Sequence, residues 1–346
     1  MSDYFTTGFI RDTEQRSADD KRERTQSWHG LGEIVELDEG MGIEDIRHKA
    51  GWNWETELVP CFCTVDGVVR ETERMEVIRS DTRKSLGNVG KGYTPLQPAK
   101  ALEAVRPWIE AGEAIPQSAG TLKGGVVSWL QLRLDCDPIE PVKGDVTEPM
   151  FLFTQGHNGT SSVNVGLTPI RVVCWNTLRA GLRDRGAQII RIIHRKNVVK
   201  ATESVIGSLD TAKREFLATG EKLEAMARMG VNSRDLDRFF RLVVEAPLDE
   251  ELKGRKRNMV EELKAHLELA PGGMVSSGTL YAALNAVTYH NTHKRGTRIA
   301  EGTENTPTAR AENRLYGLWF GTGNQSNARA WALAEEWIAK GYLAAA

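Results

Sequence analysis

Basic side chains are concentrated in one internal stretch of the sequence, residues 171–200. The stretch holds eight lysines and arginines and one acid, Asp184, which gives it a local net charge of +7 in a chain whose formal net charge is −2. Arginines predominate, and a guanidinium makes paired hydrogen bonds to phosphate oxygens and stacks on planar bases. The stretch therefore predicts a surface that binds a polyanion, and nucleic acid fits this chemistry best.

The spacing within this basic stretch brings several groups together. Arg179 and Arg183 are four residues apart and share one face of a helix, whereas Arg191 and Arg195 project from or just beyond a strand. A helix that begins near residues 174–176 would also point its free backbone N–H groups at a phosphate. The predicted phosphate contacts are Arg171, Asn176, Thr177, Arg179, Arg183, Arg191, His194, Arg195 and Lys196.

The basic stretch also has a plainer interpretation. Because the rest of the chain carries an excess of acidic residues, these arginines could pair with carboxylates elsewhere in the fold and form an ordinary solvated face. Two shorter basic runs, residues 253–257 (KGRKR) and 290–298 (HNTHKRGTR), could extend a binding surface, although helix ends often carry such charges for solubility alone. The sequence leaves both interpretations open.

Aromatic rings near the basic stretch favour a single-stranded ligand, because every base offers a face for stacking. Trp175 lies inside the stretch, and Tyr93 is a second possible stacking platform. A turn-rich segment, residues 155–160 (QGHNGT), adds the side chains of His157 and Asn158 as a ligand loop. The expected partner is accordingly nucleic acid, and single-stranded DNA in the first instance.

Other reactive side chains do not form a recognisable catalytic or metal site. Cys174 beside arginines could act as a nucleophile, but sequence order supplies no base for it, and a core cysteine explains it better. The pairs Cys61/Cys63 and His290/His293 match no zinc spacing, and no Walker loop, dinucleotide fingerprint or nucleophile elbow is present. The prediction is a binding protein rather than an enzyme, with no catalytic residue, metal or cofactor.

The first half of the chain is predicted to consist mainly of strands and hairpins, which position the candidate binding residues. Alternation of apolar and polar residues predicts strands at 33–37, in three runs between 58 and 93, on both sides of residues 123–125, and at 149–155, 161–167 and 188–193. Asp66 followed by Gly67 is a strong hairpin signal, and residues 99–111 have helical spacing. The fold class is thus α+β, with an antiparallel, hairpin-rich N-terminal half and a mainly helical C-terminal half.

From about residue 199 the sequence is helical. Helices fit 233–244, 249–269, 277–293 and 326–340, with a polar, turn-rich loop at 296–307. An earlier helix carries a heptad-like apolar stripe, which predicts either a homo-oligomer or packing on the protein's own sheet. The stripe consists of Val205, Leu209, Ala212, Phe216, Thr219, Leu223 and Met226. The predicted organisation is a flexible arm at 1–26, a β-rich α+β core at 27–198 and a helical region packed on it at 199–346.

Composition indicates a cytoplasmic protein. Apolar residues make up 40% of the chain and charged residues 27%, which is ordinary for a globular protein and argues against wholesale disorder. No apolar run is long enough to span a bilayer, and the first 26 residues lack the apolar core of a signal peptide. Four cysteines are too few for a disulfide framework, so we expect reduced thiols and no membrane partner.

Several short motifs occur together from Trp28 onward: WHGLG, LGNVGKGYTPLQP, AGTLKGG with SWLQLRL, TPIRVVCWNTL and GTLYAALNAVTYHNTH. In this combination the sequence resembles the phage/plasmid-like family that carries the domain of unknown function 932. The resemblance implies a phage or plasmid context and no established activity. The family pattern falls on residues 28–32, 93–97, 119–125, 171–178 and His194, so it overlaps the basic stretch. The sequence departs from the family pattern at Pro98, where the family often has asparagine.

Together these features predict a phage- or plasmid-encoded protein of DNA metabolism that binds or anneals single-stranded DNA, with self-assembly through its helical half as a further expectation. Two alternatives stay open. One is an enzyme that acts on a nucleotide or a phosphorylated small molecule, with residues 155–160 and the region of Arg171 as its anion pocket. The other is an interaction protein that binds a host factor.

Overall fold

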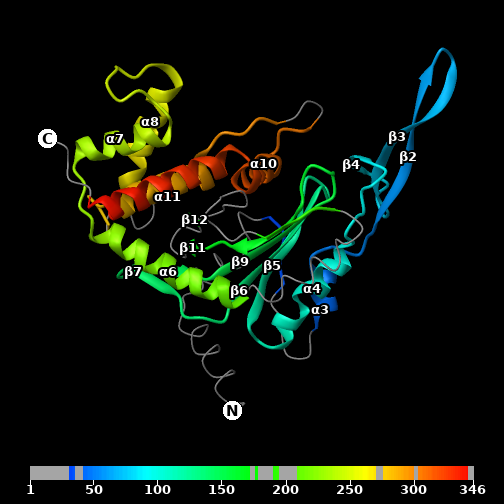
Figure 1. Ribbon diagram of the computed structural model, residues 1–346, viewed down its shortest axis with the longest axis horizontal. Helices are drawn as coiled ribbons and strands as arrows, with labels where there is room; N and C mark the ends of the chain where they lie inside the picture. The colour runs from blue at the N-terminus through cyan, green and yellow to red at the C-terminus, as the bar shows by residue number, and fades with distance from the viewer. Residues whose placement is uncertain are drawn as a thin grey trace.

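A computed structural model describes residues 31–35, 42–171, 176–177, 190–194, 209–269, 276–299 and 303–341 of the chain. Within these ranges the fold is α+β, as predicted. Antiparallel sheets fill the N-terminal half and helices fill the C-terminal half (Figure 1). The expected arm at residues 1–26 lies outside the described residues.

A six-stranded antiparallel sheet forms the centre of the fold, in the spatial order β1-β5-β6-β9-β10-β13. Gly32 is required where the chain enters β1, because its φ is +79° and a Cβ there would lie 2.5 Å from the carbonyl oxygen of Ala119. This position belongs to the WHGLG motif. The strands are β1 (Glu33–Ile34), β5 (Ala114–Leu122), β6 (Val127–Leu134), β9 (Met150–Gly156), β10 (Val163–Leu167) and β13 (Ile190–Ile192).

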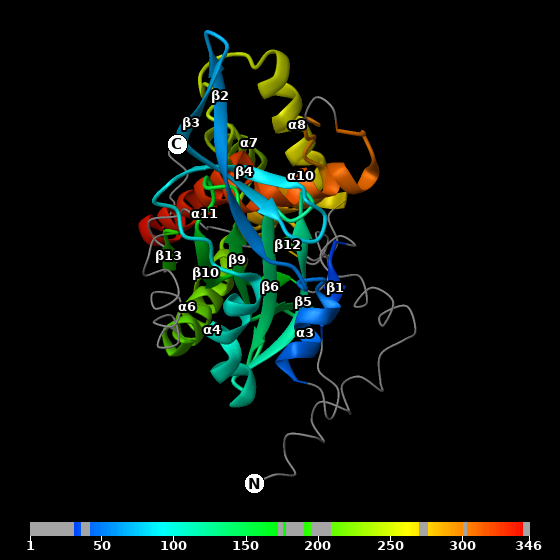
Figure 2. The ribbon, with the colours of Figure 1, turned by 90° about the vertical axis from the view of Figure 1, so that its right-hand side faces the viewer.

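Side-chain alternation gives the central sheet two apolar faces, and helices cover both of them (Figures 1 and 2). Leu130 and Phe151 belong to a core on one face that α3, α4 and the start of α6 complete. Trp129 belongs to the core on the opposite face, where its ring meets Trp319 of α10 edge-on at 5.8 Å between centroids. The covering helices are α3 (Ile43–Lys49), α4 (Pro98–Glu110), α6 (Leu209–Arg228) and α10 (Pro307–Phe320).

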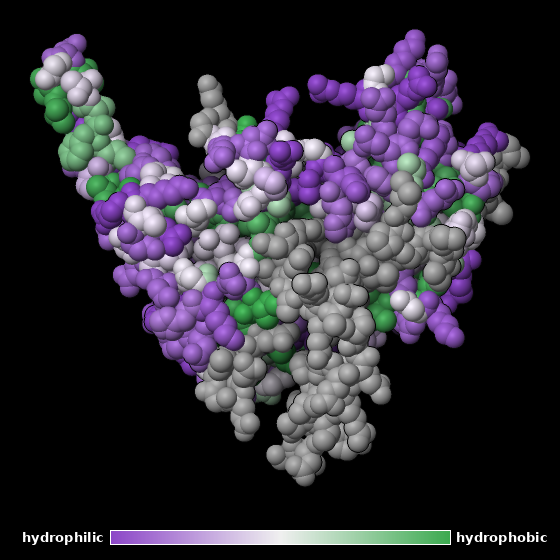
Figure 3. Space-filling view, turned by 180° about the vertical axis from the view of Figure 1, so that it is seen from behind, coloured by the Kyte–Doolittle hydropathy of each residue, from purple (hydrophilic) through white to green (hydrophobic). Residues whose placement is uncertain are grey.

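Three strands form a finger that projects from the body of the molecule (Figure 1). These are β2 (Thr56–Val65), β3 (Val68–Arg79) and β4 (Ser85–Gly90). The predicted hairpin is confirmed, since Asp66 and Gly67 form its turn with φ of 52° and 77°. Apolar side chains are exposed along the outer part of the finger, as Figure 3 shows, and Phe62 is 60% exposed. Only the base of the finger packs against the sheet, through Trp54 and Val77.

A four-stranded sheet lies between the central sheet and the helical half, in the order β12-β11-β8-β7. The prediction of a helix that begins near residues 174–176 is wrong. Asn176 and Thr177 form a strand that pairs with the preceding one, with Arg171 opposite Asn176. Pairing with this neighbouring strand satisfies backbone groups that a helix start would have left free for a phosphate. The strands are β7 (Ile139–Val142), β8 (Asp145–Glu148), β11 (Ile170–Arg171) and β12 (Asn176–Thr177).

The helical half contains one helix that the sequence patterns did not predict, α10. It begins directly after the expected loop, where Pro307 occupies the first turn and the Thr306 hydroxyl accepts the backbone N–H of Ala309 at 3.1 Å. None of the helices in the described ranges combines the length and apolar character that a bilayer crossing requires. The remaining elements are α7 (Ser233–Val243), α8 (Gly254–Leu269), α9 (Leu280–Tyr289), the π-helical turn η3 (His290–Lys294) and α11 (Thr322–Lys340).

The heptad-like stripe packs inside the chain. All of its described members are buried on α6: Leu209 and Ala212 belong to the core of the central sheet, whereas Leu223 and Met226 belong to the core of the helical half. Val205 lies outside the described residues. Because this stripe is already covered by its own chain, a homo-oligomer would have to use another surface.

We expect Phe216→Ala to lower the free energy of unfolding by about 3–5 kcal/mol, because Phe216 is fully buried on the stripe and its removal leaves a cavity. The neighbouring Leu217 is 53% exposed, so Leu217→Ala serves as a matched control with an expected change of under about 0.5 kcal/mol. Urea unfolding of the full chain measures both. Equal losses in the two variants would show that α6 does not pack as described.

Candidate functional site

Three of the predicted site residues, Tyr93, His157 and His194, meet where the finger joins the central sheet. The rings of Tyr93 and His194 stack with 4.9 Å between centroids and an interplanar angle of 30°. The Tyr93 hydroxyl donates to the carbonyl of Gly156 at 3.4 Å, and the backbone N–H of Thr94 donates to the carbonyl of His194 at 3.4 Å. These contacts tie the chain after β4 and the chain after β13 to the end of β9.

His157 is enclosed at the end of β9. Its Nε2 lies 3.1 Å from the Ser128 hydroxyl, and its backbone N–H donates to Val126. The ring of Trp54 meets the imidazole edge-on at 5.1 Å. Burial lowers the pKa of His157 to about 3 and that of His194 to about 4, so both rings are neutral at physiological pH.

The predicted ligand loop is a compact turn that closes on the finger. The Asn158 side chain accepts the backbone N–H groups of Thr160 and Ser161, each at 3.1 Å. A Cβ on Gly87 of β4 would lie 2.7 Å from the Cα of Asn158, so the two backbones touch and only glycine fits there. The Asn158 side-chain oxygen therefore shapes its own turn, the backbone of Asn158 lies against β4, and a ligand contact by its side chain stays a prediction.

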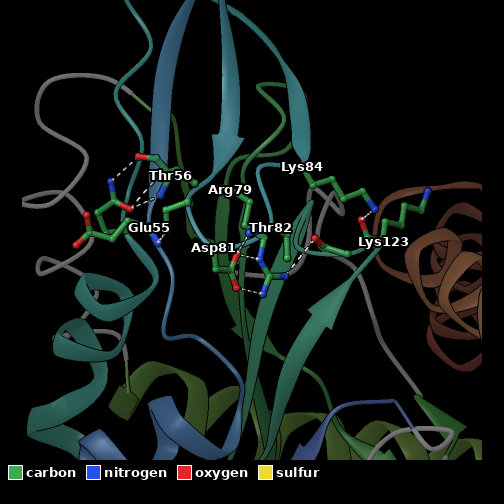
Figure 4. A network of polar contacts seen from close by, with 10 residues as sticks. Glu55, Thr56, Arg79, Asp81, Thr82, Lys84 and Lys123 are labelled. Atoms are coloured by element: carbon green, nitrogen blue, oxygen red, sulfur yellow. Dashed lines mark hydrogen bonds and ion pairs between the residues drawn. The ribbon is translucent and has the colours of Figure 1, made fainter.

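An ionic network fixes the base of the finger (Figure 4). The Arg79 guanidinium donates to both carboxylate oxygens of Asp81, at 2.7 and 2.9 Å, and to the carbonyl of Gly124 in the β5–β6 turn at 3.3 Å. It lies 4.6 Å from the ring centre of Trp54. The hydrogen bond from Arg79 lowers the pKa of Asp81. Trp54 thus lies between Arg79 and the buried His157.

A second clamp holds the first strand of the finger. The Gln97 side-chain oxygen accepts the backbone N–H of Thr56 at 2.8 Å and its hydroxyl at 3.1 Å, and the Gln97 amide donates to the Thr56 carbonyl at 3.1 Å. Gln97 ends the TPLQ part of the motif that follows β4. Its role is architectural, because it pairs the edge of β2 with the start of α4.

The chemistry that this junction can perform is limited by burial. Ser128 and His157 are spaced like a nucleophile and its base, but both are sealed within the sheet, so a substrate cannot reach them. Gln155, whose amide donates to the carbonyl of Leu96, is also fully buried. The buried side chains of Gln155 and His157 therefore do not form the anion pocket considered for residues 155–160. Tyr93 can offer at most one ring face to a ligand, since His194 covers the other.

Arg191 differs from the residues of this junction because it is exposed. It lies on β13, at the edge of the central sheet, opposite Asn164 of β10. Its Nε donates to the Ser162 hydroxyl at 2.9 Å, and Ser162 in turn donates to Asn164 at 3.1 Å. No carboxylate in the described ranges pairs with Arg191, so a neutral network orients this cation and leaves its charge uncompensated.

The other predicted contacts of the basic stretch are only partly described. Arg171, Asn176 and Thr177 are placed as backbone in β11 and β12. Trp175, Arg179, Arg183, Arg195 and Lys196 lie outside the described residues. The two shorter basic runs do come together, since Arg255 and Lys256 line the same cavity as Arg295, which sequence spacing alone did not indicate. Arg329 of α11 also lines it and was not predicted.

Residues 85–314 match the family model described as Domain of unknown function (DUF932). The match covers well over half of the chain and includes Tyr93, His157, Arg191 and His194. The chain belongs to the DUF932 family. No curated protein and no solved structure matches it. The family description assigns no activity to the DUF932 domain, so function has to be argued from the geometry of this chain.

Metal binding has no support in the described part of this DUF932 protein. No three His, Cys, Asp or Glu side chains among these residues are grouped to hold an ion. Cys61, Cys63 and Cys136 are free thiols, and Cys174 lies outside the described ranges. Burial raises the pKa of the Cys136 thiol, which keeps it protonated and unreactive at neutral pH.

The neutral, buried His194 predicts a pH-dependent stability. The folded protein keeps this ring uncharged down to about pH 4, whereas the unfolded chain protonates it near pH 6.5, so the contribution is complete above about pH 6.5 and is lost as pH falls toward 4. Between pH 7.5 and 5 we expect His194→Gln to lose less stability than the wild type, by roughly 1–2 kcal/mol. Urea unfolding at the two pH values measures this difference.

His48 is exposed on α3 and provides the control for this experiment. His48→Gln should retain the full pH dependence of the wild type. If His194→Gln also retains it, His194 is not held neutral in the folded state.

Proposed function

We propose that this DUF932 protein binds nucleic acid, with single-stranded DNA as its preferred ligand, and that it serves the DNA metabolism of a phage or plasmid. The observation that carries the proposal is the state of Arg191. It is the one basic residue of the stretch whose side chain the structure describes, and it is exposed, oriented by Ser162 and without a carboxylate partner in the described ranges. An oriented cation of this kind is suited to a phosphate oxygen.

The contrast with other arginines supports this proposal over an ordinary solvated face. Arg106 pairs with Glu103 at 2.7 Å, and Arg241 pairs with Asp237 at 2.6 Å. Both of these arginines pair with acids one turn away on the same helix. Arg191 has no acidic partner among the described residues, and it belongs to a stretch with a net charge of +7.

Single-stranded DNA is proposed over duplex because Trp175 lies inside the basic stretch and can offer a ring for base stacking. The edge position of β13 supports an extended ligand, since a strand edge presents its side chains in a line. Annealing would require the protein to hold two strands, which self-assembly provides. The α6 stripe is buried, so such an assembly must use another surface.

Fluorescence anisotropy with a 5′-hydroxyl oligonucleotide, single-stranded or duplex, across a salt series tests the proposal. We expect tighter binding to the single strand and an affinity that falls steeply with salt. Arg191→Ala should weaken binding roughly three- to tenfold and reduce the salt slope by about 0.7–1, because one phosphate contact is lost. Arg179→Ala combined with Arg183→Ala should weaken it further.

Arg106→Ala is the matched control, because it removes an arginine whose charge is already paired on α4. It should bind as the wild type does. If the protein does not bind DNA, or if binding does not depend on salt, the proposal is refuted. If Arg106→Ala and Arg191→Ala weaken binding equally, the basic stretch is not the DNA-binding site.

A further inference from the structure

The two shorter basic runs of the sequence meet at one cavity of about 300 Å³ in the helical half. Arg255 and Lys256 reach it from α8, and His290 and Arg295 reach it from the π-helical turn and the residue that follows. Arg329 of α11 completes the set. This volume lies at the lower end of the range for sites that hold a small molecule.

The charges around this cavity are not balanced. Four cations line it together with one acid, Glu245, which pairs with Arg329 at 2.9 Å. Arg295 donates instead to two neutral oxygens, on Asn291 at 2.8 Å and Thr322 at 3.0 Å. Lys256 donates to a backbone carbonyl, and Arg255 has no partner among the described residues. The cavity therefore carries an excess of positive charge, which an anion would balance.

The start of α11 adds to this positive field. Thr322, Gln325 and Ser326 line the cavity from the first turns of the helix. Gly321 precedes the helix without a side-chain cap, and the first turn contains no acid. A helix start in this condition has free N–H groups and the positive end of the helix dipole, both of which favour a phosphate.

His290 forms part of the wall of this cavity. It is only 3% exposed and lines the cavity, and its Nε2 has no hydrogen-bond partner among the residues that the structure describes. Its Nδ1 lies 3.4 Å from His266 Nε2 and 3.6 Å from a carboxylate oxygen of Glu262. Because Nε2 is itself inaccessible to solvent, the His290 ring contributes shape to the cavity wall rather than an exposed donor.

The π-helical turn holds these groups in place before a ligand arrives. The backbone N–H of Arg295 donates to the carbonyl of His290 at 2.7 Å, which widens the last turn after α9. Asn291 ties the turn to Asn327 of α11 at 2.7 Å, and Arg314 of α10 donates to the carbonyl of Arg295 at 3.1 Å. Single π-helical turns are rare and are frequent at functional sites. Here the turn places His290 and Arg295 at one cavity.

We propose that this cavity binds the terminal phosphate of a phosphorylated small molecule, with a mononucleotide as the type of ligand. The cationic side and the start of α11 take the phosphate, and the apolar side chains of Val243, Met259 and Leu263 provide a wall for a planar or apolar body. The site is separate from the basic stretch, and it does not depend on the proposed binding of nucleic acid.

Isothermal titration of the full chain with inorganic pyrophosphate and with a panel of nucleoside mono- and triphosphates tests this site. We expect saturable one-to-one binding and a higher melting temperature in the presence of the ligand that binds. Arg255→Ala should weaken binding at least about tenfold without changing the melting temperature of the free protein, because Arg255 is exposed and unpaired.

Arg257→Ala is the matched control, because Arg257 belongs to the same basic run and helix but does not line the cavity. It should bind the ligand as the wild type does. Equal weakening by Arg255→Ala and Arg257→Ala would overturn the proposal in favour of diffuse charge attraction. Absence of binding to pyrophosphate and to every nucleotide at millimolar concentration would also overturn it.

Two oligonucleotides that differ only in a 5′-phosphate distinguish the source of the phosphate. If the phosphate of a small molecule is the ligand, both oligonucleotides should bind with equal affinity, and Arg255→Ala should change neither. A different result would overturn the small-molecule assignment: the protein prefers the 5′-phosphorylated strand, Arg255→Ala abolishes that preference, and free nucleotides do not bind. Arg191→Ala should leave pyrophosphate binding unchanged, so failure of one proposal is distinguishable from failure of the other.

Discussion

Burial of both faces of the six-stranded sheet is the constraint on which the rest of the structure depends. One face needs α4 and the start of α6, and the other needs α10, whose Trp319 packs on Trp129. Helices from both halves of the chain are therefore fixed against the same strands. Because Arg314 lies on α10 and holds the carbonyl of Arg295, the position of the cavity in the helical half also follows from how the sheet is covered.

The junction between finger and sheet illustrates how this chain treats buried polar groups. Each cation there has a partner of its own, as Arg79 does with Asp81 and Trp54, and both imidazoles lose their charge to burial. The finger is thus tied at its base by directional contacts, whereas its outer part exposes apolar side chains such as Phe62. The junction is built to hold the finger, and its reactive-looking groups are unavailable for chemistry.

Two other places in the described part of the chain contain cations without acidic partners, and their shapes suit different proposed ligands. Arg191 lies on β13, the last strand in the order of the six-stranded sheet, and it belongs to the basic stretch of the sequence. The cavity near Arg255 and Arg295 is a recess of about 300 Å³, and its limited volume suits one terminal group rather than a polymer backbone. The proposed DNA contact and the proposed phosphate cavity thus lie on different elements of the described fold.

The sequence by itself determined the features that depend on neighbouring residues. These are the α+β class, the hairpin at Asp66 and Gly67, the apolar stripe of α6 and the clustering of basic residues. Only the tertiary structure decided which partners those features take. Asn176 and Thr177 pair with β11 instead of starting a helix, because a strand edge offers hydrogen bonds that local propensity does not reveal. His157 is buried and Arg191 exposed, and the two short basic runs converge, because contacts between segments distant in sequence are set by packing rather than by spacing along the chain.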